Sequence, residues 1–230
     1  MTKQIVIFGT GEIAELAHYY FNNDEKFNYD VVAFTADDQY VNEDNFNGVP
    51  LVPVSKLREI YPPDKYAAHV ALSYNKLNKI REEKYYLMKE LGYELVSYVC
   101  SKSVHWPDLS IGDNCFILEN QTIQPTVTIG DNVMIWSGNH LGHGCNIEDH
   151  VYISSHVCIA GHVNVGKRSF LGVNCAVKDF VNIGEDNFVT MGANVVKNTS
   201  ADCTVTASEI FESENIVNKK LKKKYFNLEM

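Results

Sequence analysis

The chain has 230 residues, of which 45% are hydrophobic and 21% are charged, and its formal net charge is −9 at pH 7. This length fits one large domain or two small ones. The acidic balance argues against a general role in binding nucleic acid or a membrane surface. The one basic run, KKLKKK at Lys219–Lys224, has two interpretations: a solvated helix in the C-terminal tail, or a contact with a phosphate.

The cysteines and the apolar segments bear on the compartment of the protein. The start, MTKQIVIFGTG, leads directly into a strand-like run and lacks the pattern of a signal peptide. No apolar stretch reaches the ~18 residues that a membrane-spanning helix needs. The six cysteines form no CxxC pair. We therefore expect a cytoplasmic protein whose cysteines are buried, reduced thiols.

Strand-like and helix-like segments alternate in residues 1–100. QIVIF, YDVVAF, AAHVALS and YELVSYV have the apolar runs of buried strands, whereas EIAELAHYYFNN and YNKLNKIREEKYYLMKELG have helical spacing. We interpret the segment TADDQYVNEDNFNGVPLVPVSKL as a long polar loop. Strands that alternate with helices predict a small α/β domain with a parallel sheet.

Two short motifs follow the predicted strands of this region. Gly9, Thr10 and Gly11 form a Gly-x-Gly turn between the first strand and a helix. Such a turn can present backbone N–H groups and a helix N-terminus to a phosphate, although the third glycine of the dinucleotide fingerprint is missing and a simple turn is the alternative. Asp37 and Asp38 close the second strand, where carboxylates can bind a ribose or a base; a solvated loop is the alternative.

Residues 104–200 carry a six-residue repeat. Every sixth residue from Ile111 to Val195, fifteen in all, is aliphatic, and glycine is frequent at the next position. A period of six predicts a parallel β-helix of about five coils, in which the aliphatic side chains stack inward. We expect the glycines to relieve crowding at the turns and to supply positive φ there. Residues 201–230 then form a C-terminal tail with a helix.

Five histidines lie within Asn139–Val163. In a coil of three hexapeptides, stacked residues are eighteen apart, and no two of these histidines have that separation. His150, His156 and His162 occupy equivalent places in successive hexapeptides, so they point in three directions. A zinc site needs at least three converging ligands. Such a site would therefore have to form across a trimer interface.

The pattern as a whole resembles the bacterial hexapeptide-repeat sugar acyltransferases of the sialic-acid O-acetyltransferase and nucleotide-aminosugar N-acetyltransferase type. The resemblance extends over nearly the whole chain and rests on FGTGEIAEL, AFTADD, FNGVPL, VALSYNKLNKIR, the repeat and LGHGCNIEDHVYIS. It implies a Rossmann-like N-terminal domain that helps to hold a nucleotide sugar, followed by a left-handed β-helix. It also implies a homotrimer with acyl-CoA between neighbouring β-helices. The expected substrate-binding residues are Gly9, Thr10, Gly11, Asp37, Asp38 and Asn75.

His143, in LGHGC, matches the histidine that acts as general base in similar acyltransferases. A sugar amine or hydroxyl that attacks a thioester must lose a proton, and imidazole titrates near the working pH. The tetrahedral intermediate needs a donor for its oxyanion, and a backbone N–H is a common solution. Gly161 follows His143 by eighteen residues and should stack on it. The resemblance implies that the Gly161 amide lies by the thioester carbonyl.

The chain departs from the family pattern at four places. Gly144 stands where many relatives have an Asp or Glu that orients the base, so we expect Glu148, Asp149 or a group of the next subunit to take that role. Tyr152 stands where many relatives have a second histidine. The usual glycine-glycine-histidine turn reads GEI at residues 11–13, and CTVTASEIF replaces the usual Gly-x-Pro-Ala close of the β-helix.

These observations predict an enzyme that moves an acetyl group from acetyl-CoA to the amino group of a nucleotide-linked amino sugar. The product would serve the synthesis of lipopolysaccharide, another surface polysaccharide or a glycan. His143 is the expected base, and the reaction needs no metal. Three alternatives stay open: a sugar O-acetyltransferase, a metalloenzyme at a trimer interface, and a scaffold protein that has lost catalysis, as Gly144 suggests.

Overall fold

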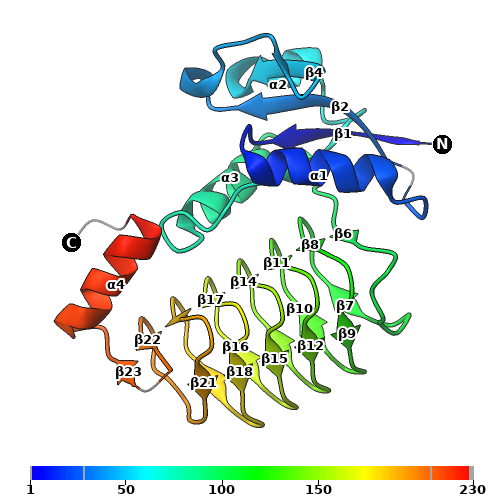
Figure 1. Ribbon diagram of the computed structural model, residues 1–230. Coiled ribbons are helices and arrows are strands. Elements are labelled where there is room, and N and C mark those ends of the chain that lie inside the picture. Colours follow the sequence, from blue (N-terminus) through cyan, green and yellow to red (C-terminus); the bar gives the residue numbers. More distant parts are fainter. Residues whose placement is uncertain (1, 28, 208, 228–230) are drawn as a thin grey trace.

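A five-stranded sheet forms the N-terminal part of the chain (Figure 1). The computed structural model describes residues 2–27, 29–207 and 209–227. The sheet has the order β3-β4-β2-β1-β5, and its pairs are parallel except β3 with β4. Its strands are β1 (Lys3–Phe8), β2 (Tyr29–Ala36), β3 (Asn45–Phe46), β4 (Val49–Pro53) and β5 (Ala67–Val70). The predicted alternation of strands and helices is therefore present.

Helices cover both faces of this sheet. Helix α1 (Glu12–Asn23) shares a core with Ile5 and Ile7 of β1. Helices α2 (Val54–Ile60) and α3 (Lys79–Glu90) share a second core with Val6, which points to the opposite face. This alternation along β1 places α1 on one side of the sheet and the other two helices on the other side.

The interpretation of residues 35–57 as a polar loop is wrong. This segment contains the short helix η1 (Asp38–Tyr40), strands β3 and β4, and the start of α2. Strand β4 pairs in parallel with β2 inside the sheet. Pro50 and Pro53 obscure this strand in the sequence, because proline lacks the N–H group that a central strand normally donates.

The second part of the chain is a parallel β-helix whose strands form three sheets, one on each side of the coil (Figure 1). We call the first sheet the covered face, because the N-terminal domain packs on it. It comprises β6 (Tyr98–Val99), β8 (Phe116–Ile117), β11 (Met134–Ile135), β14 (Tyr152–Ile153), β17 (Phe170–Leu171), β20 (Phe188–Val189) and β22 (Thr204–Val205), with β23 (Ile210–Phe211) antiparallel at its end. The asparagine face comprises β7 (Ser110–Ile111), β10 (Thr128–Ile129), β13 (Asn146–Ile147), β16 (Asn164–Val165) and β19 (Asn182–Ile183). The cysteine face comprises β9 (Thr122–Ile123), β12 (His140–Leu141), β15 (Cys158–Ile159), β18 (Ala176–Val177) and β21 (Asn194–Val195).

The coil repeats every eighteen residues, as the pairing of His140 with Cys158 shows. This register confirms three hexapeptides per coil. The second residue of each strand points inward, and the aliphatic positions from Ile117 to Val195 form one buried core against which Ile111 packs. Burial of one such side chain is worth roughly 1.5–3 kcal/mol relative to its exposure, so the periodic aliphatic column is what holds the coil together.

The glycines after the aliphatic positions serve close packing and not positive φ. A Cβ atom added at Gly142 would lie 2.6 Å from the carbonyl carbon of Ala160 in the next coil. Positive φ occurs instead at corner residues such as Asn132, His150 and Arg168, with φ of 55°, 62° and 61°. The expectation of positive φ at these glycines is therefore wrong, because the corner that needs it lies two residues further along the chain.

The coil is slightly longer than the predicted residues 104–200. Strand β6 pairs with β8 before this range, and β22 pairs with β20 after it. Tyr98 and Val99, which lie in the predicted N-terminal domain of residues 1–100, are therefore part of the coil. The hexapeptide period and the parallel pairing fit the left-handed coil that the family resemblance implies.

The cysteines differ from the expectation at one position. Cys100, Cys115, Cys145, Cys175 and Cys203 are buried and free. Cys158 is exposed on the cysteine face, because it occupies the outward-pointing place of its two-residue strand β15. The expectation that all six thiols are buried is therefore wrong for this residue.

The covered face packs directly against the N-terminal domain. Its outward residues Phe116, Met134 and Tyr152 belong to the same core as Phe21 of α1. The ring centroids of Tyr20 and Phe116 lie 5.9 Å apart in an edge-to-face arrangement. The two parts of the chain therefore share a hydrophobic core, which fixes the position of the sheet above the coil.

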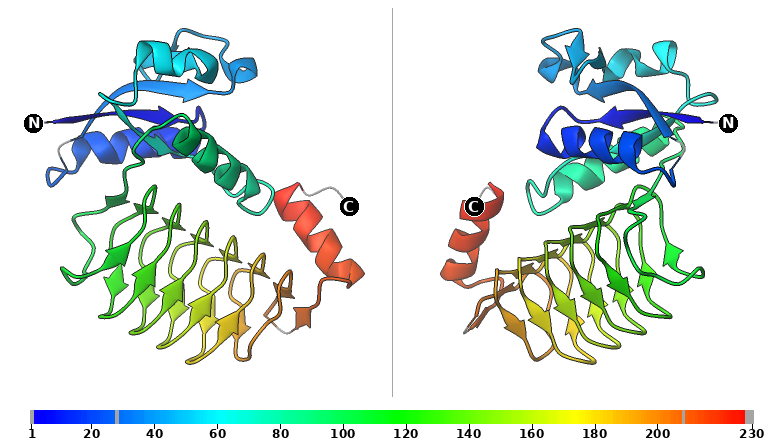
Figure 2. Two further views of the ribbon diagram at one scale, coloured as in Figure 1. Left: turned by 180° about the vertical axis from the view of Figure 1, so that it is seen from behind. Right: turned by 45° about the vertical axis from the view of Figure 1, so that its right-hand side comes forward.

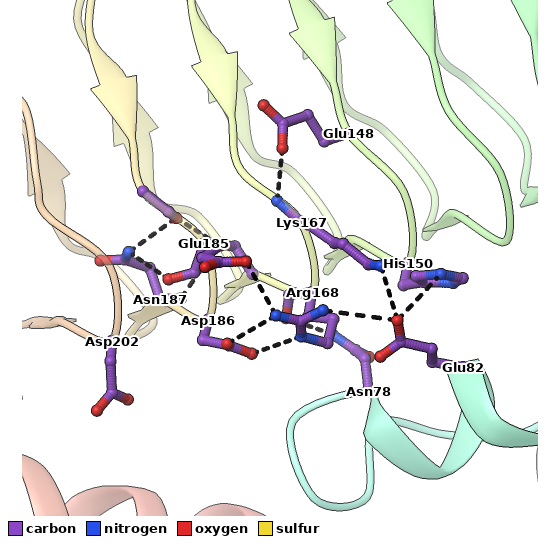
Figure 3. Close-up of polar contacts among 12 residues, drawn as sticks. Asn78, Glu82, Glu148, His150, Lys167, Arg168, Glu185, Asp186, Asn187 and Asp202 are labelled. Atoms are coloured by element: carbon purple, nitrogen blue, oxygen red, sulfur yellow. Dashed lines mark hydrogen bonds and ion pairs between the residues drawn. The ribbon is translucent and has the colours of Figure 1, made fainter.

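A charged cluster fixes α3 on the corner between the asparagine face and the covered face (Figure 3). Glu82 Oε1 lies 2.8 Å from Nζ of Lys167 and 3.5 Å from Nη1 of Arg168. Asn78 donates from Nδ2 to the carbonyl oxygen of Arg168 at 2.8 Å. Because Glu82 is mostly hidden from solvent, these ion pairs are screened less than pairs on an open surface.

Arg81 and His150 are buried beneath this cluster. Arg81 donates from Nη2 to the carbonyl oxygen of His150 at 2.9 Å and from Nη1 to that of Asn132. Burial, with the positive charge of Arg81 as the next cause, lowers the pKa of His150 to about 3. His150 is therefore neutral near pH 7, and its Nδ1 accepts a hydrogen bond from Nδ2 of Asn132 at 2.8 Å.

Helix α4 (Ile216–Phe226) follows the last coil and runs back toward the N-terminal domain (Figure 2). Asn215 caps its first turn by accepting a hydrogen bond from the N–H group of Val217 at 2.8 Å. The helix buries Asn218, Lys222 and Phe226. It therefore lies beside the end of the coil and not in open solvent.

Candidate active site

His143 lies at the corner between the cysteine face and the asparagine face, one coil above Gln124. Gln124 Oε1 accepts a hydrogen bond from the backbone N–H of His143 at 2.8 Å and lies 3.2 Å from its Nδ1. Because the same atom accepts a backbone N–H, it is the amide oxygen, and Nδ1 must carry a hydrogen to donate to it. The exposed His143 ring therefore has a free lone pair on Nε2, as a general base needs.

Gly161 lies directly beside the ring of His143 in the next coil, as the eighteen-residue period predicts. A Cβ atom at Gly161 would lie 2.8 Å from Cε1 and 3.1 Å from Nε2 of His143. Glycine is thus required here for the ring to keep its position. The N–H group of Gly161 donates to Oδ1 of Asp179 at 3.2 Å. A thioester oxygen would have to replace this long hydrogen bond in order to use the same donor.

The absence of a side chain at Gly144 makes room for a second imidazole. Gly144 has φ of +67°, and a Cβ atom there would lie 2.5 Å from Nδ1 of His162. The ring centroids of His162 and His143 lie 4.8 Å apart, with the rings almost perpendicular. The ring of Phe180 stacks on that of His162, with their centroids 5.1 Å apart. Gly144 is therefore part of a packed arrangement and not a simple loss of a carboxylate.

The residues expected to orient His143 have other partners. Glu148 accepts a hydrogen bond from the backbone N–H of Lys167 at 3.0 Å, and Asp149 accepts one from the backbone N–H of Asp131 at 2.8 Å. Within one chain, Gln124 takes this role instead. The sequence offers only a weak signal for it, since Gln124 precedes His143 by nineteen residues and therefore lies almost directly below it in the coil.

A cavity of about 400 Å³ opens where β1 and β2 end. Gly9, Thr10, Asp37 and Asn75 line it, so four of the predicted substrate-binding residues are brought together. Asp37 Oδ1 lies 2.9 Å from Nζ of Lys84, which also lines the cavity. The cavity therefore contains glycine backbone, a carboxylate and lysines, which are groups suited to phosphate and ribose oxygens.

The two glycines of the Gly-x-Gly turn have different reasons to be glycine. Gly9 has φ of +137°, and a Cβ atom there would lie 2.6 Å from the carbonyl oxygen of Ala71. Gly11 is the N-cap of α1 with φ of −110°, and a Cβ atom there would meet no atom within 4 Å. Packing therefore explains Gly9, whereas Gly11 leaves open space at the N-terminus of α1.

Asp38 lies outside the cavity that Asp37 lines. Asp38 Oδ1 accepts a hydrogen bond from the backbone N–H of Ser55 at 3.2 Å, at the start of α2. Hydrogen bonds from Ser55 lower the pKa of Asp38. The structure thus separates the two adjacent carboxylates: Asp37 lines the cavity, and Asp38 interacts with a helix.

Two further cavities continue along the seam between the N-terminal domain and the covered face. The first has a volume of about 590 Å³, includes Gly11, and shares Asn75 with the cavity described above. The second has a volume of about 380 Å³, contains six aromatic side chains among its lining residues, and shares Tyr74, Trp136 and Tyr152 with the first. Because neighbouring cavities share lining residues, we call the three together the groove; the cavity described above contains Gly9 and Thr10 of the Gly-x-Gly turn.

His143 and this groove lie at different edges of the coil. The groove follows the covered face, whereas His143 occupies the corner between the other two faces. In the described ranges, no group of three or more His, Cys, Asp or Glu side chains is arranged to hold a metal ion. Nor is any helix in those ranges long and apolar enough to cross a membrane.

A model of the bacterial transferase hexapeptide family, with six repeats, matches residues 126–161. The chain therefore carries the hexapeptide repeat of bacterial transferases. The matched residues include His143 and Gly161, and they begin two residues after Gln124. No curated protein sequence matches the chain.

Solved structures resemble the chain over nearly its whole length. A histidine-to-asparagine variant of perosamine N-acetyltransferase from Caulobacter crescentus, in complex with CoA and GDP-perosamine, is 22% identical with a TM-score of 0.79 and covers 90% of this chain and 94% of its own. The acetyltransferase domain of PglB from Neisseria gonorrhoeae FA1090, in complex with acetyl coenzyme A, is 18% identical with a TM-score of 0.78 and covers 91% and 98%. WeeI from Acinetobacter baumannii AYE is 20% identical with a TM-score of 0.75 and covers 91% and 99%. At these identities the likeness establishes a shared fold.

Proposed function

We propose that this protein transfers an acetyl group from acetyl-CoA to the amino group of a nucleotide-linked amino sugar. The observation that carries the proposal is the His143 ring, held by Gln124 and packed on Gly161, on a hexapeptide coil that also bears a nucleotide-sized groove. The fold it shares with N-acetyltransferases that bind CoA and GDP-perosamine supports this choice of substrates. Such a reaction fits a cytoplasmic step in the synthesis of lipopolysaccharide or another glycan.

In the proposed reaction the amine nitrogen attacks the carbonyl carbon of the thioester, and Nε2 of His143 accepts the proton that this nitrogen loses. The tetrahedral intermediate then collapses with cleavage of the C–S bond, and the departing thiolate takes the proton back from His143. The products are an amide and free CoA. The N–H of Gly161 is the candidate donor to the oxyanion, in place of its bond to Asp179.

The N-terminal domain would hold the nucleotide. Its parallel strands β4, β2, β1 and β5 have the order of half a Rossmann fold, in which ligands bind beyond the carboxyl ends of the strands. The cavity with Gly9, Thr10 and Asp37 lies at those ends of β1 and β2. Asn75 and Gly11 continue the same surface toward the β-helix.

The separation of His143 from the groove supports a homotrimer in which each site combines two subunits. The cysteine face lies between the His143 corner and the corner next to the groove. Its outward residues include His140, Cys158 and Ala176, of which two are small. Packing copies of the chain through this face would bring His143 of one subunit toward the groove of the next.

The arrangement of Gln124 and His162 favours a working site over an inactive scaffold. Gln124 supplies the hydrogen-bond acceptor that Gly144 lacks. A hydroxyl acceptor would use the same base, so O-acetylation is the second candidate reaction.

A thiol-release assay tests the proposal. Acetyl-CoA would be offered with UDP-, GDP- and dTDP-linked amino sugars and with their hydroxyl counterparts. We expect release with an amino sugar, and a loss of roughly 10²–10⁴ in turnover for His143→Ala without loss of the assembly. Release with hydroxyl sugars alone would establish O-acetylation. Equal turnover in His143→Ala would remove this residue as the base.

A further inference from the structure

Helix α4 is held firmly against the last coils of the β-helix. Nζ of Lys222 is buried and donates to the carbonyl oxygen of Asp186 at 2.7 Å, and it also pairs with Oδ1 of Asp202. The buried Asn218 donates from Nδ2 to the carbonyl oxygen of Asp202 at 2.8 Å. The central lysine of the basic run is therefore a buried anchor and not a solvated charge.

The last turn of α4 contacts the N-terminal domain. Phe226 is 1% exposed and packs with Leu77 and Phe188 in a small core of their own. Its carbonyl oxygen accepts a hydrogen bond from the N–H group of Lys76 at 3.0 Å. Helix α4 thus bridges the far end of the coil and the segment that leads from β5 to α3, as both views in Figure 2 show.

That segment has an unusual conformation. Lys76, Leu77 and Asn78 are consecutive residues with φ of 51°, 51° and 66°. Each left-handed non-glycine residue costs about 1–2 kcal/mol, so three in a row persist only where the surroundings hold them. Phe226 holds Lys76, and the carbonyl oxygen of Arg168 holds Asn78. The turn is therefore fixed jointly by α4 and the β-helix.

This turn and the end of α4 form part of the groove. Phe226 and Asn227 line the cavity that also contains Gly9 and Asp37. Tyr225 lines the aromatic cavity further along the groove, where its ring centroid lies 5.3 Å from that of Phe188. Three consecutive residues of the C-terminal segment thus contact two cavities of the same groove.

We propose that the end of α4 is a wall of the acceptor site, with Phe226 and Asn227 as specificity-determining residues for the nucleoside diphosphate part of the acceptor. This inference rests on the proposed function, because it assigns the groove to the acceptor. Two effects support it. Asn227 offers an exposed side-chain amide at the cavity, and Phe226 fixes the turn that carries Asn75 and Lys76 into it.

Binding of the acyl donor, acetyl-CoA, should not depend on the end of α4. His143 and Gly161 lie at a different corner of the coil, whereas Lys222 and Asn218 of α4 bind Asp186 and Asp202 next to strands of the covered face. Changes at the end of α4 should therefore alter affinity for the nucleotide of the acceptor and leave affinity for acetyl-CoA unaltered.

Calorimetric titration of the full chain with GDP, UDP, dTDP and acetyl-CoA tests this inference. Asn227→Gly removes the amide and keeps the left-handed φ of 54°. Phe226→Leu keeps an apolar side chain but changes its shape. Lys220→Ala, on the exposed side of the same helix, is the matched control. We expect each variant to raise the Kd of the bound nucleoside diphosphate by roughly three- to tenfold. In Asn227→Gly this is the value of about one hydrogen bond, and in Phe226→Leu it follows from a shift of the turn at Lys76.

The expected pattern has an unchanged Kd for acetyl-CoA in both variants and an unchanged nucleotide Kd in Lys220→Ala. Equal nucleotide affinity in all three variants, or a joint loss of both ligands, would overturn the assignment of α4. If the unaltered protein binds acetyl-CoA but no nucleoside diphosphate, the acceptor assignment fails together with this inference. If the unaltered protein binds a nucleoside diphosphate but transfers no acetyl group, the proposed reaction fails. The measured affinities would still decide the role of α4.

Discussion

Gln124 Oε1 lies 2.8 Å from the backbone nitrogen of His143 and 3.2 Å from Nδ1 of the same residue. One oxygen atom therefore fixes both the position of the corner and the tautomer of the ring. The partner is a neutral amide, so it orients the imidazole without stabilising its protonated form as strongly as a carboxylate would. This choice of partner should be visible in the pH dependence of the reaction.

Two substitutions of Gln124 distinguish its role in orienting the His143 ring from the effect of a charge beside that ring. Gln124→Ala removes both hydrogen bonds that Oε1 accepts from His143, and loss of the bond to Nδ1 frees the ring. We expect a fall of roughly tenfold in kcat, about 1.4 kcal/mol of activation free energy. Gln124→Glu keeps an acceptor and adds a charge that favours the imidazolium. The acid limb of the pH profile of kcat/KM for Gln124→Glu should therefore move to higher pH. Identical profiles for Gln124→Glu and the unaltered protein would show that Gln124 only fills space.

Gly144 and His162 should behave as a coupled pair. An aspartate at position 144 would place its Cβ 2.5 Å from Nδ1 of His162, which is closer than the two atoms can approach. We expect Gly144→Asp alone to lower kcat by roughly tenfold, about 1.4 kcal/mol of activation free energy, because the displaced His162 ring packs on His143.

The double variant Gly144→Asp with His162→Gly should recover most of this loss, and His162→Gly alone is its control. Kinetic measurement of the four proteins gives the coupling energy directly. Simply additive losses would contradict a shared space for the two side chains.

The eighteen-residue period explains why part of the site could be predicted from the sequence. The contact of Gly161 with His143 follows from counting alone, since equivalent places stack in every coil. Nothing in the sequence indicates which side chain turns toward the ring, so Gln124 was missed. The different roles of Asp37 and Asp38 depend on which carboxylate faces the cavity, and that depends on how β4 and α2 pack. The contact of Phe226 with the groove depends on a helix whose docking site no local pattern specifies.

The two adjacent carboxylates offer a matched comparison. Asp37 lines the cavity that we propose for the nucleotide, beside Lys84. Asp37→Asn should therefore raise the KM for the acceptor by roughly tenfold, as expected for a hydrogen bond to a charged group. Asp38→Asn should leave this KM unchanged and slightly lower the melting temperature, because Asp38 accepts from Ser55 at the start of α2. Steady-state kinetics with varied acceptor distinguishes them. A larger effect of Asp38→Asn on KM would reverse the assignment.

The buried His150 should make the docking of α3 sensitive to acid. Folding lowers the pKa of His150 from 6.5 to about 3, so the unfolded chain binds the proton more tightly. Its contribution to stability is complete above pH 6.5 and is lost as pH falls toward 3, by about 1.4 kcal/mol per pH unit.

In His150→Asn nothing titrates at this place, and Asn114 and Asn132 occupy the equivalent corners of earlier coils. We expect urea denaturation to show a steeper loss of unfolding free energy between pH 6.5 and pH 4.5 in the unaltered protein than in His150→Asn. Parallel curves would mean that His150 does not remain neutral in the folded protein.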